Sequence, residues 1–137
     1  MSESRWLLLF GLVNLSLLGF LTPLLDGAAL AAQDPLFFSW PGVLVIGLWG
    51  LAYMAVAPIW RMAPWLLLVF ALEKAFFAGR WLLWLSEHHA GMSALFEKAP
   101  TVAMFYAGYG AWDGFCALMF LLFCLRARRL QGGMSAA

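Results

Sequence analysis

Four ionisable side chains lie inside apolar stretches of this 137-residue sequence: Glu73, Lys74, Arg80 and Asp113. A charge at the centre of a membrane-spanning helix costs roughly 2.5–3.5 kcal/mol on insertion scales, so such residues need partners and commonly mark functional sites. The two acids and two bases balance in charge. The sequence therefore predicts a buried ionic cluster, which could hold a polar ligand or carry protons.

The positions of these residues place three of them at a common depth. Glu73 and Lys74 lie near the middle of an apolar stretch over residues 62–85, and Asp113 lies near the middle of another over residues 101–125. Side chains at one depth can meet when helices pack side by side across a bilayer. We predict that Lys74 pairs with Asp113 or with Glu73.

A second set of polar residues lies nearer to one end of the same stretches. Arg80 lies about 9 Å beyond Lys74 at 1.5 Å per residue, and it shares a helical stripe with Glu73. Tyr106 and Tyr109 are expected at the level of Arg80. This arrangement predicts a polar funnel that leads to a cavity occupied by lipid or a small amphiphile, bounded by Glu73, Arg80, Tyr106, Tyr109 and Asp113.

Asn14 adds an amide near the middle of the first apolar stretch. An amide inside a membrane usually forms hydrogen bonds with another helix, so we expect Asn14 to belong to the buried polar cluster in a structural role. The cluster as a whole has two interpretations. It is either a salt-bridge network that fixes the register of the helices, or a polar or proton-linked site.

Other kinds of site find little support in the sequence. His88 and His89 are weak metal candidates, because they are adjacent in a predicted connection whereas zinc needs three or four converging ligands; no metal and no cofactor are expected. Glu73 or Asp113 could act as a general acid or base, but no nucleophile accompanies them, which favours a protein that is not an enzyme. A net charge of +1 gives no reason to expect nucleic acid.

Four long apolar stretches position these residues. A hydrophobic fraction of 65%, a charged fraction of 11% and a mean hydropathy of +0.88 are typical of a membrane protein. We expect one all-α domain over residues 1–137, with loops over residues 26–40 and 86–100 and a tail over residues 126–137. The domain is predicted to be an antiparallel bundle of four transmembrane helices, which cover about residues 6–25, 42–58, 62–85 and 101–125.

Glycines in two of these stretches predict close contacts between helices. Gly42, Gly47 and Gly50 lie in the second stretch, and Gly110 and Gly114 flank Asp113 in the fourth. Small residues let neighbouring helix backbones approach closely in a membrane. We expect the helices to pack most tightly at these positions.

The basic residues predict an orientation. With the N-terminus inside, five arginines face the cytoplasm and Lys98 alone faces outward: Arg5, Arg61, Arg126, Arg128 and Arg129. An excess of Lys and Arg in short cytoplasmic connections sets the orientation of membrane proteins. We therefore expect both termini in the cytoplasm, in a multi-pass protein of the bacterial inner (plasma) membrane.

Residues 47–84 resemble the middle of small four-span bacterial membrane proteins of the DoxX-like and BphX-like kind. The features that carry the resemblance are a glycine-containing second span ending near Tyr53, a short connection with Arg61, and the pair Glu73 and Lys74 in the third span. Such families largely lack an assigned activity. The resemblance therefore implies an architecture rather than a mechanism.

These observations favour a small integral membrane protein that binds or transports a small amphipathic molecule through a buried polar and aromatic site. The alternative is a non-catalytic accessory subunit of a larger membrane complex, which would account for the small size and the absence of a catalytic motif. The expected partners are membrane lipid, the amphipathic ligand, and another membrane protein or a second copy of this chain.

Overall fold

The structure is a computed structural model that describes residues 1–18 and 27–134, and these residues form helices and their connections without any strand. The all-α prediction is therefore confirmed. The helices, in chain order, are α1 (Glu3–Ser16), α3 (Gly27–Gln33), α4 (Pro35–Phe38), α5 (Trp40–Val56), η2 (Trp60–Met62), α6 (Pro64–His88), η3 (His89–Gly91), α7 (Met92–Lys98) and α8 (Pro100–Met134).

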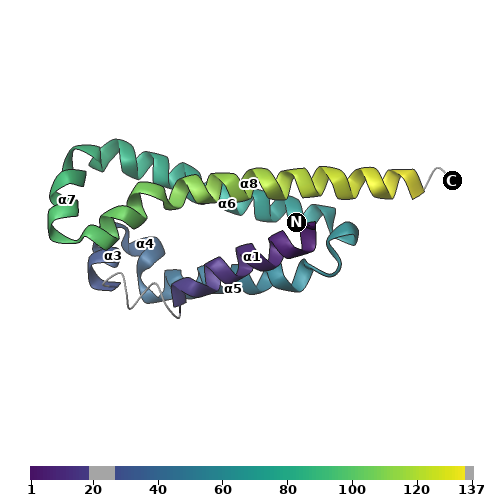
Figure 1. Cartoon of the computed structure of the whole chain (residues 1–137), viewed down its shortest axis with the longest axis horizontal. Helices are drawn as coiled ribbons and strands as arrows, with labels where there is room; N and C mark the ends of the chain where they lie inside the picture. The colour runs from purple at the N-terminus through teal and green to yellow at the C-terminus, as the bar shows by residue number, and fades with distance from the viewer. Residues whose placement is uncertain (19–26, 135–137) are drawn as a thin grey trace.

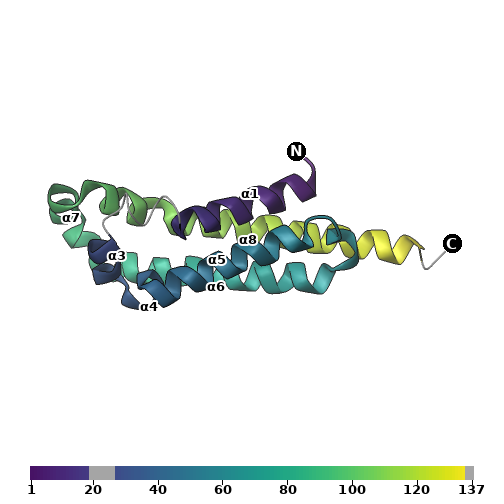
Figure 2. The ribbon, with the colours of Figure 1, turned by 90° about the horizontal axis from the view of Figure 1, so that it is seen from below.

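The longest helices run along the long axis of the molecule in two layers. Figures 1 and 2 together place α1 beside α5 in one layer and α6 beside α8 in the other, each helix antiparallel to its neighbour in the layer. The short helices α3, α4 and α7 lie at one end, whereas α1 begins and α8 ends toward the other (Figure 1). The start of α1 and the end of α8 therefore lie toward the same end of the molecule.

Within the described residues, one helix is long and apolar enough to cross a membrane by length and composition alone, and it is α8 over Pro100–Gly133. Helix α5 is also apolar but shorter, with 17 residues. Helix α6 has 25 residues but carries Glu73, Lys74 and Arg80. The predicted first span extends to residue 25 and so lies partly outside the described residues.

Prolines stand at the start of several of these helices. Pro35, Pro41 and Pro64 stand in the first turns of α4, α5 and α6, where a missing N–H costs least. The start predicted at Pro41 agrees with the structure to within one residue. The short connection through η2 reverses the chain between α5 and α6, as expected for neighbouring antiparallel helices.

The glycines predicted to bring helices together do so between α1 and α5. A Cβ atom on Gly50 would lie 2.7 Å from the Gly11 carbonyl oxygen, and one on Gly11 would lie 2.6 Å from the Gly50 carbonyl oxygen. Neither position has room for a larger residue. Close approach of the two backbones at this point confirms the prediction for the second apolar stretch.

Helices α6 and α8 meet through a side chain rather than through two backbones. A Cβ atom on Gly110 would lie 2.1 Å from Trp81 Cγ, and one on Gly114 would lie 3.9 Å from the Ala78 Cβ. The Trp81 indole N–H also donates to the Tyr106 carbonyl over 2.7 Å, which fixes the ring against α8. The expected close backbone contact around Asp113 is thus replaced at Gly110 by a tryptophan ring.

Two connections predicted as loops are largely helical. The described part of the first contains α3 and α4, and the second is formed by the last turn of α6, η3 and α7. Asp34 caps α4 by accepting a hydrogen bond from the Leu36 N–H over 3.2 Å. Helix α8 also continues beyond the predicted span end at residue 125, as far as Met134. Apolar side chains in these segments pack on the long helices, which stabilises helical turns that local sequence alone would not hold.

The apolar core is divided into two clusters along the long axis. The first centres on Phe10, Tyr53, Phe70 and Phe120, and the second centres on aromatic and aliphatic side chains contributed by the short helices and by the outer turns of α6 and α8. Among the described residues, aromatic ones supply six of the fourteen buried residues of the first cluster and five of the ten of the second. The buried polar residues Asn14, Lys74 and Asp113 belong to neither cluster.

The contact at Gly110 predicts a large difference between two glycines of α8. Gly110→Ala should lower the free energy of unfolding by about 1–3 kcal/mol, because the added methyl must displace the fixed Trp81 ring. Gly108→Ala is the matched control, since a Cβ atom there meets nothing within 4 Å, and alanine is intrinsically the better helix former by about 1 kcal/mol. Detergent-titrated unfolding would measure both; equal stability of the two variants would contradict the packing described for α6 and α8.

Candidate functional site

The centre of the site is an ion pair between α6 and α8. Lys74 Nζ donates to Asp113 Oδ1 over 2.7 Å, and the two side chains are 3% and 10% exposed. Lys74 Nζ also donates to Asn14 Oδ1 over 3.2 Å, while Asn14 Nδ2 donates to the Ile46 carbonyl over 3.1 Å. The pair predicted from depth is confirmed in its Asp113 form, and it is tied to α1 and α5 through one amide.

Glu73 pairs with Tyr53 rather than with the neighbouring Lys74. The Tyr53 hydroxyl donates to Glu73 Oε2, which links α5 to α6, while Glu73 Oε1 is buried without a hydrogen-bond partner. Neighbouring residues on a helix point about 100° apart, so Glu73 and Lys74 face different helices. The Lys74 side chain therefore reaches Asp113 on α8 rather than Glu73.

Lys74 lies where the two apolar clusters meet. Its Nζ atom is 5.9 Å from the centroid of the Tyr53 ring, in the first cluster, and 5.7 Å from that of Phe77, in the second. Both distances fall within the range of cation–π attraction. The Tyr53 and Phe77 rings therefore add cation–π attraction to the hydrogen bonds that Lys74 makes with Asp113 and Asn14.

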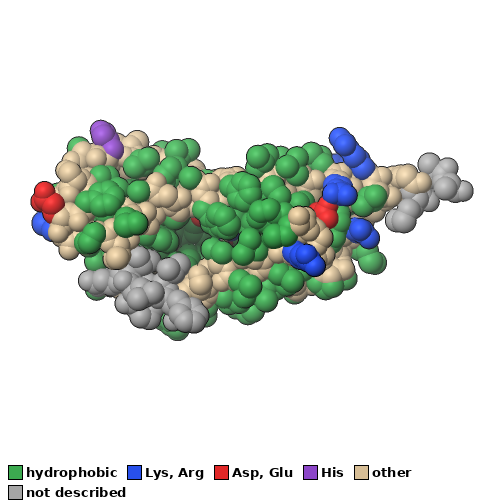
Figure 3. Space-filling model, in the orientation of Figure 1, with side chains coloured by type: hydrophobic (Ala, Val, Ile, Leu, Met, Phe, Trp, Pro, Cys, Tyr) green, Lys and Arg blue, Asp and Glu red, His purple; other side chains and the backbone are tan. Residues whose placement is uncertain are grey.

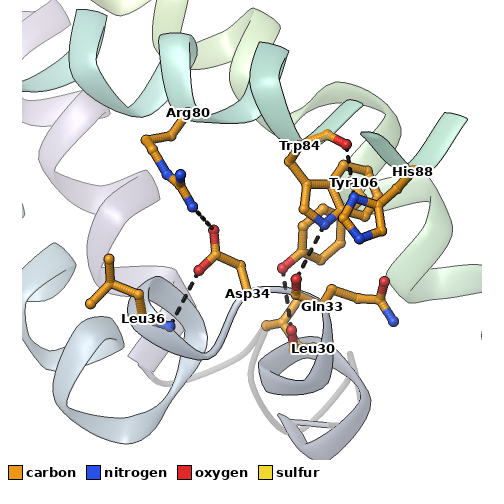
Figure 4. A network of polar contacts seen from close by, with 8 residues as sticks. All are labelled: Leu30, Gln33, Asp34, Leu36, Arg80, Trp84, His88 and Tyr106. Atoms are coloured by element: carbon orange, nitrogen blue, oxygen red, sulfur yellow. Dashed lines mark hydrogen bonds and ion pairs between the residues drawn. The ribbon is translucent and has the colours of Figure 1, made fainter. Parts of the chain in front are cut away.

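Arg80 is drawn away from this cluster by an acid that the sequence analysis did not select. Arg80 Nη2 lies 3.4 Å from Asp34 Oδ2, and the guanidinium carbon lies 5.8 Å from the Phe37 ring centroid. Figure 4 shows Asp34 between α3 and α4, pointing toward Arg80 on α6. The Arg80 side chain remains 40% exposed, whereas that of Asp34 is 6% exposed. Arg80 therefore ties the short helices to α6.

Tyr106 serves the same junction. Its hydroxyl donates to the Leu30 carbonyl over 3.2 Å, and its ring lies 4.3 Å from that of Trp84, whose indole N–H donates to the Gln33 carbonyl over 3.2 Å. Figure 4 shows these contacts beside the Arg80 pair. Tyr106 is fully buried. Its hydroxyl therefore holds α3 against α8.

The two histidines have local partners. His88 Nδ1 hydrogen-bonds the Trp84 carbonyl over 3.0 Å, and its ring stacks on Trp84 at 4.8 Å (Figure 4). His89 Nδ1 hydrogen-bonds the Ser86 carbonyl over 3.0 Å. Across residues 1–18 and 27–134, no group of three or more His, Cys, Asp or Glu side chains is placed to hold a metal ion.

A partly open cavity of about 70 Å³ lies beside the ion pair, between the two layers of helices. Asn14, Lys74 and Asp113 form its polar part. Aromatic rings from α4, α6 and α8 form most of the remaining wall: Phe38, Phe77, Phe105, Tyr109 and Trp112. Figure 3 shows this face of the molecule hollowed between hydrophobic side chains. The site is thus an apolar pocket beside a satisfied ion pair.

The cavity differs in its boundary from the one expected. Of the five predicted residues, Tyr109 and Asp113 line it. Glu73, Arg80 and Tyr106 do not, because each is turned to a partner elsewhere: Tyr53, Asp34 and the Leu30 carbonyl. The cavity consequently lies nearer to α1 than the predicted funnel, and Val13 and Asn14 contribute to it.

Sequence signals were available for the two polar partners that were missed. Asp34 directly precedes Pro35, the arrangement of a helix cap followed by a first-turn proline. Tyr53 is the one strongly polar side chain of an otherwise apolar, glycine-rich stretch. Each could have been matched to an unpaired ionisable residue on the helix over residues 62–85.

No protein-family model, no curated protein and no solved structure matches the chain. The chemistry of the site therefore has to be derived from its own residues.

The ion pair predicts a strongly coupled pair of substitutions. Lys74→Met or Asp113→Leu alone should destabilise the protein by roughly 3–5 kcal/mol, because each leaves the other charge buried without its partner, whereas the double variant should recover part of that loss. Unfolding measurements on the four proteins of this double-mutant cycle give the coupling.

The pair of Arg126 with Glu3 supplies the control for this cycle. The Arg126 side chain is 67% exposed, so Arg126→Gln should cost less than about 1 kcal/mol. A Lys74→Met variant as stable as the parent would contradict the buried ion pair between Lys74 and Asp113.

Proposed function

We propose that this chain is a four-span protein of the bacterial inner membrane, with both termini in the cytoplasm, and that it binds a small amphipathic molecule in the cavity beside Lys74 and Asp113. The observation that carries the binding proposal is the apolar cavity placed directly against a buried, neutralised ion pair. Ligand pockets in proteins are mostly apolar concavities with a few convergent polar groups.

The outer surface of the helices supports placement in a membrane. Large apolar side chains are exposed along the long helices, with Leu12, Leu48, Leu72 and Leu118 each more than half exposed. Soluble monomers rarely expose contiguous apolar patches larger than a few hundred Å². Lipid chains are the natural solvent for such a surface.

The pairing of charges supports a membrane position for α6. Its 25 residues extend about 37 Å at 1.5 Å per residue, which exceeds a hydrocarbon core of about 30 Å. Lys74 pairs with Asp113 on α8, and Arg80 pairs with Asp34 at the start of α4. Glu73 accepts a hydrogen bond from Tyr53. These contacts offset much of the cost of placing charged groups in hydrocarbon.

The distribution of arginines supports the orientation. Most Lys and Arg side chains on the face drawn in Figure 3 gather toward the end where α8 finishes. At that end Arg128 lies 5.0 Å from the Trp65 ring centroid and Arg61 lies 5.4 Å from that of Trp60. Tryptophan beside arginine is typical of the membrane interface. The resemblance to DoxX-like and BphX-like proteins agrees with this four-span architecture, and we include that kinship in the proposal.

The orientation predicts opposite labelling of two engineered cysteines. Ser93 in α7 and Gly132 near the end of α8 are both exposed, whereas the native Cys116 and Cys124 are buried. A membrane-impermeant maleimide should label Ser93→Cys in intact cells and Gly132→Cys only after the membrane is permeabilised. The reverse pattern would overturn the orientation, and labelling of both from outside would overturn the even number of spans.

The cavity predicts that protein extracted in mild detergent retains a small molecule. Native mass spectrometry should show an additional mass on the parent protein, and Val13→Phe should remove it because the new ring fills the cavity that Val13 lines. Leu12→Phe is the matched control, since Leu12 is 56% exposed and lies outside the cavity. Thermal unfolding of both variants verifies that they fold.

The same experiment distinguishes the alternative function. A second polypeptide present in equal amount, together with no retained small molecule in the parent protein, would favour an accessory subunit of a larger membrane complex. Equal retention of the small molecule by the Val13 and Leu12 variants would place the binding site outside this cavity.

A further inference from the structure

The polar atoms at the cavity are already engaged with one another. Lys74 donates to Asp113 and to Asn14, and Asn14 donates to the Ile46 carbonyl. The charges of Lys74 and Asp113 cancel. A charged ligand head placed here would have to break these bonds in a low-dielectric setting, so the part of a ligand that enters the cavity is uncharged.

The size of the cavity limits what can enter. Its volume is about 70 Å³, whereas an engineered apolar cavity that binds benzene measures about 150 Å³. A six-membered ring is therefore too large without displacing the aromatic wall, and that wall is held by mutual ring contacts. Phe105 and Tyr109 stack at 5.1 Å, and Phe38 lies edge-on to both at 5.2 and 5.3 Å. A straight hydrocarbon chain is narrow enough to fit.

The position of the cavity matches the end of such a chain. Lys74 lies near the middle of α6, so in the proposed orientation the cavity lies near the bilayer midplane. A chain whose head stays at the interface reaches that depth, since the midplane is about 15 Å from either edge of a 30 Å core. Val13, Phe105 and Trp112 are only partly buried, so the cavity opens in the seam between α1 and α8.

We infer that the cavity holds the terminal part of an unbranched alkyl chain, whose polar head lies at the membrane interface, and that it discriminates against chains ending in a ring. This inference rests on the proposed function and specifies the ligand class for the same cavity. The ligand is recognised by its chain end rather than by its head. Two sources share this chemistry, a free single-chain amphiphile and an acyl chain of a bilayer phospholipid.

Photolabelling of the full chain in phosphatidylcholine vesicles tests the inference. The probes are hexadecanol and phosphatidylcholine, each with a photoreactive diazirine at the chain end, and labelled peptides are located by mass spectrometry. Labelling should be saturable and should fall on segments around Val13 and Phe105. The stronger of the two probes identifies the source, and labelling by either supports the inference. Val13→Phe should reduce labelling at least about tenfold, while Leu12→Phe should not.

Competition by unlabelled compounds measures what the cavity recognises. Hexadecanol, hexadecylamine and hexadecanoate should compete alike, within about threefold, because their heads remain outside the cavity. A phenyl-terminated alcohol of equal length should compete at least about tenfold less well, since tenfold corresponds to a modest overpacking penalty.

Three results would count against these claims in different ways. Equal competition by the phenyl-terminated alcohol would overturn the inference and leave the proposed binding function in place. A preference of more than about tenfold for one head group would do the same, because it would place the head at the ion pair. Absence of saturable labelling by either probe would overturn the proposed function together with the inference.

Discussion

The buried contact between Lys74 and Asp113 is the constraint on which the arrangement of the long helices depends. A cation and an anion removed from water must each keep a partner, and here the partners come from α6 and α8, with Asn14 of α1 as a second acceptor. A shift of either layer along the long axis would separate these atoms. The pair therefore defines the register in which both apolar clusters can pack.

Other polar contacts between helices repeat this role elsewhere in the bundle. Tyr53 meets Glu73 across α5 and α6, and Asp34 meets Arg80 across the short helices and α6. Apolar packing gives little directional preference between helices, particularly where lipid is as apolar as leucine. Each polar contact thus removes one way in which the layers could slide, and the cavity beside Lys74 persists because the aromatic side chains around it are fixed on both sides.

The sequence predicted the all-α fold and the pairing of Lys74 with Asp113 well, and it predicted the other polar partners less well. The pairing of Lys74 followed from charge balance and from the position of Asp113 along its own apolar stretch. The partners of Tyr106 and Trp84 could not be predicted in this way, because they are backbone carbonyls of Leu30 and Gln33. Every residue carries a carbonyl, so no side-chain pattern marks an acceptor, and the fold of residues 27–38 depends on packing against distant helices.

The separation of Lys74 from its partner in the chain also bears on biosynthesis. Asp113 follows Lys74 by 39 residues, whereas Asn14 precedes it by 60. In a four-span protein made from the N-terminus, α6 would leave the ribosome while Asp113 was still unsynthesised, and its lysine would face hydrocarbon at a cost of roughly 2.5–3.5 kcal/mol. Asn14 would then be the first acceptor available. Under the proposed four-span architecture, the amide would give Lys74 a polar partner before Asp113 is made, and α6 and α8 would complete their insertion as one hairpin.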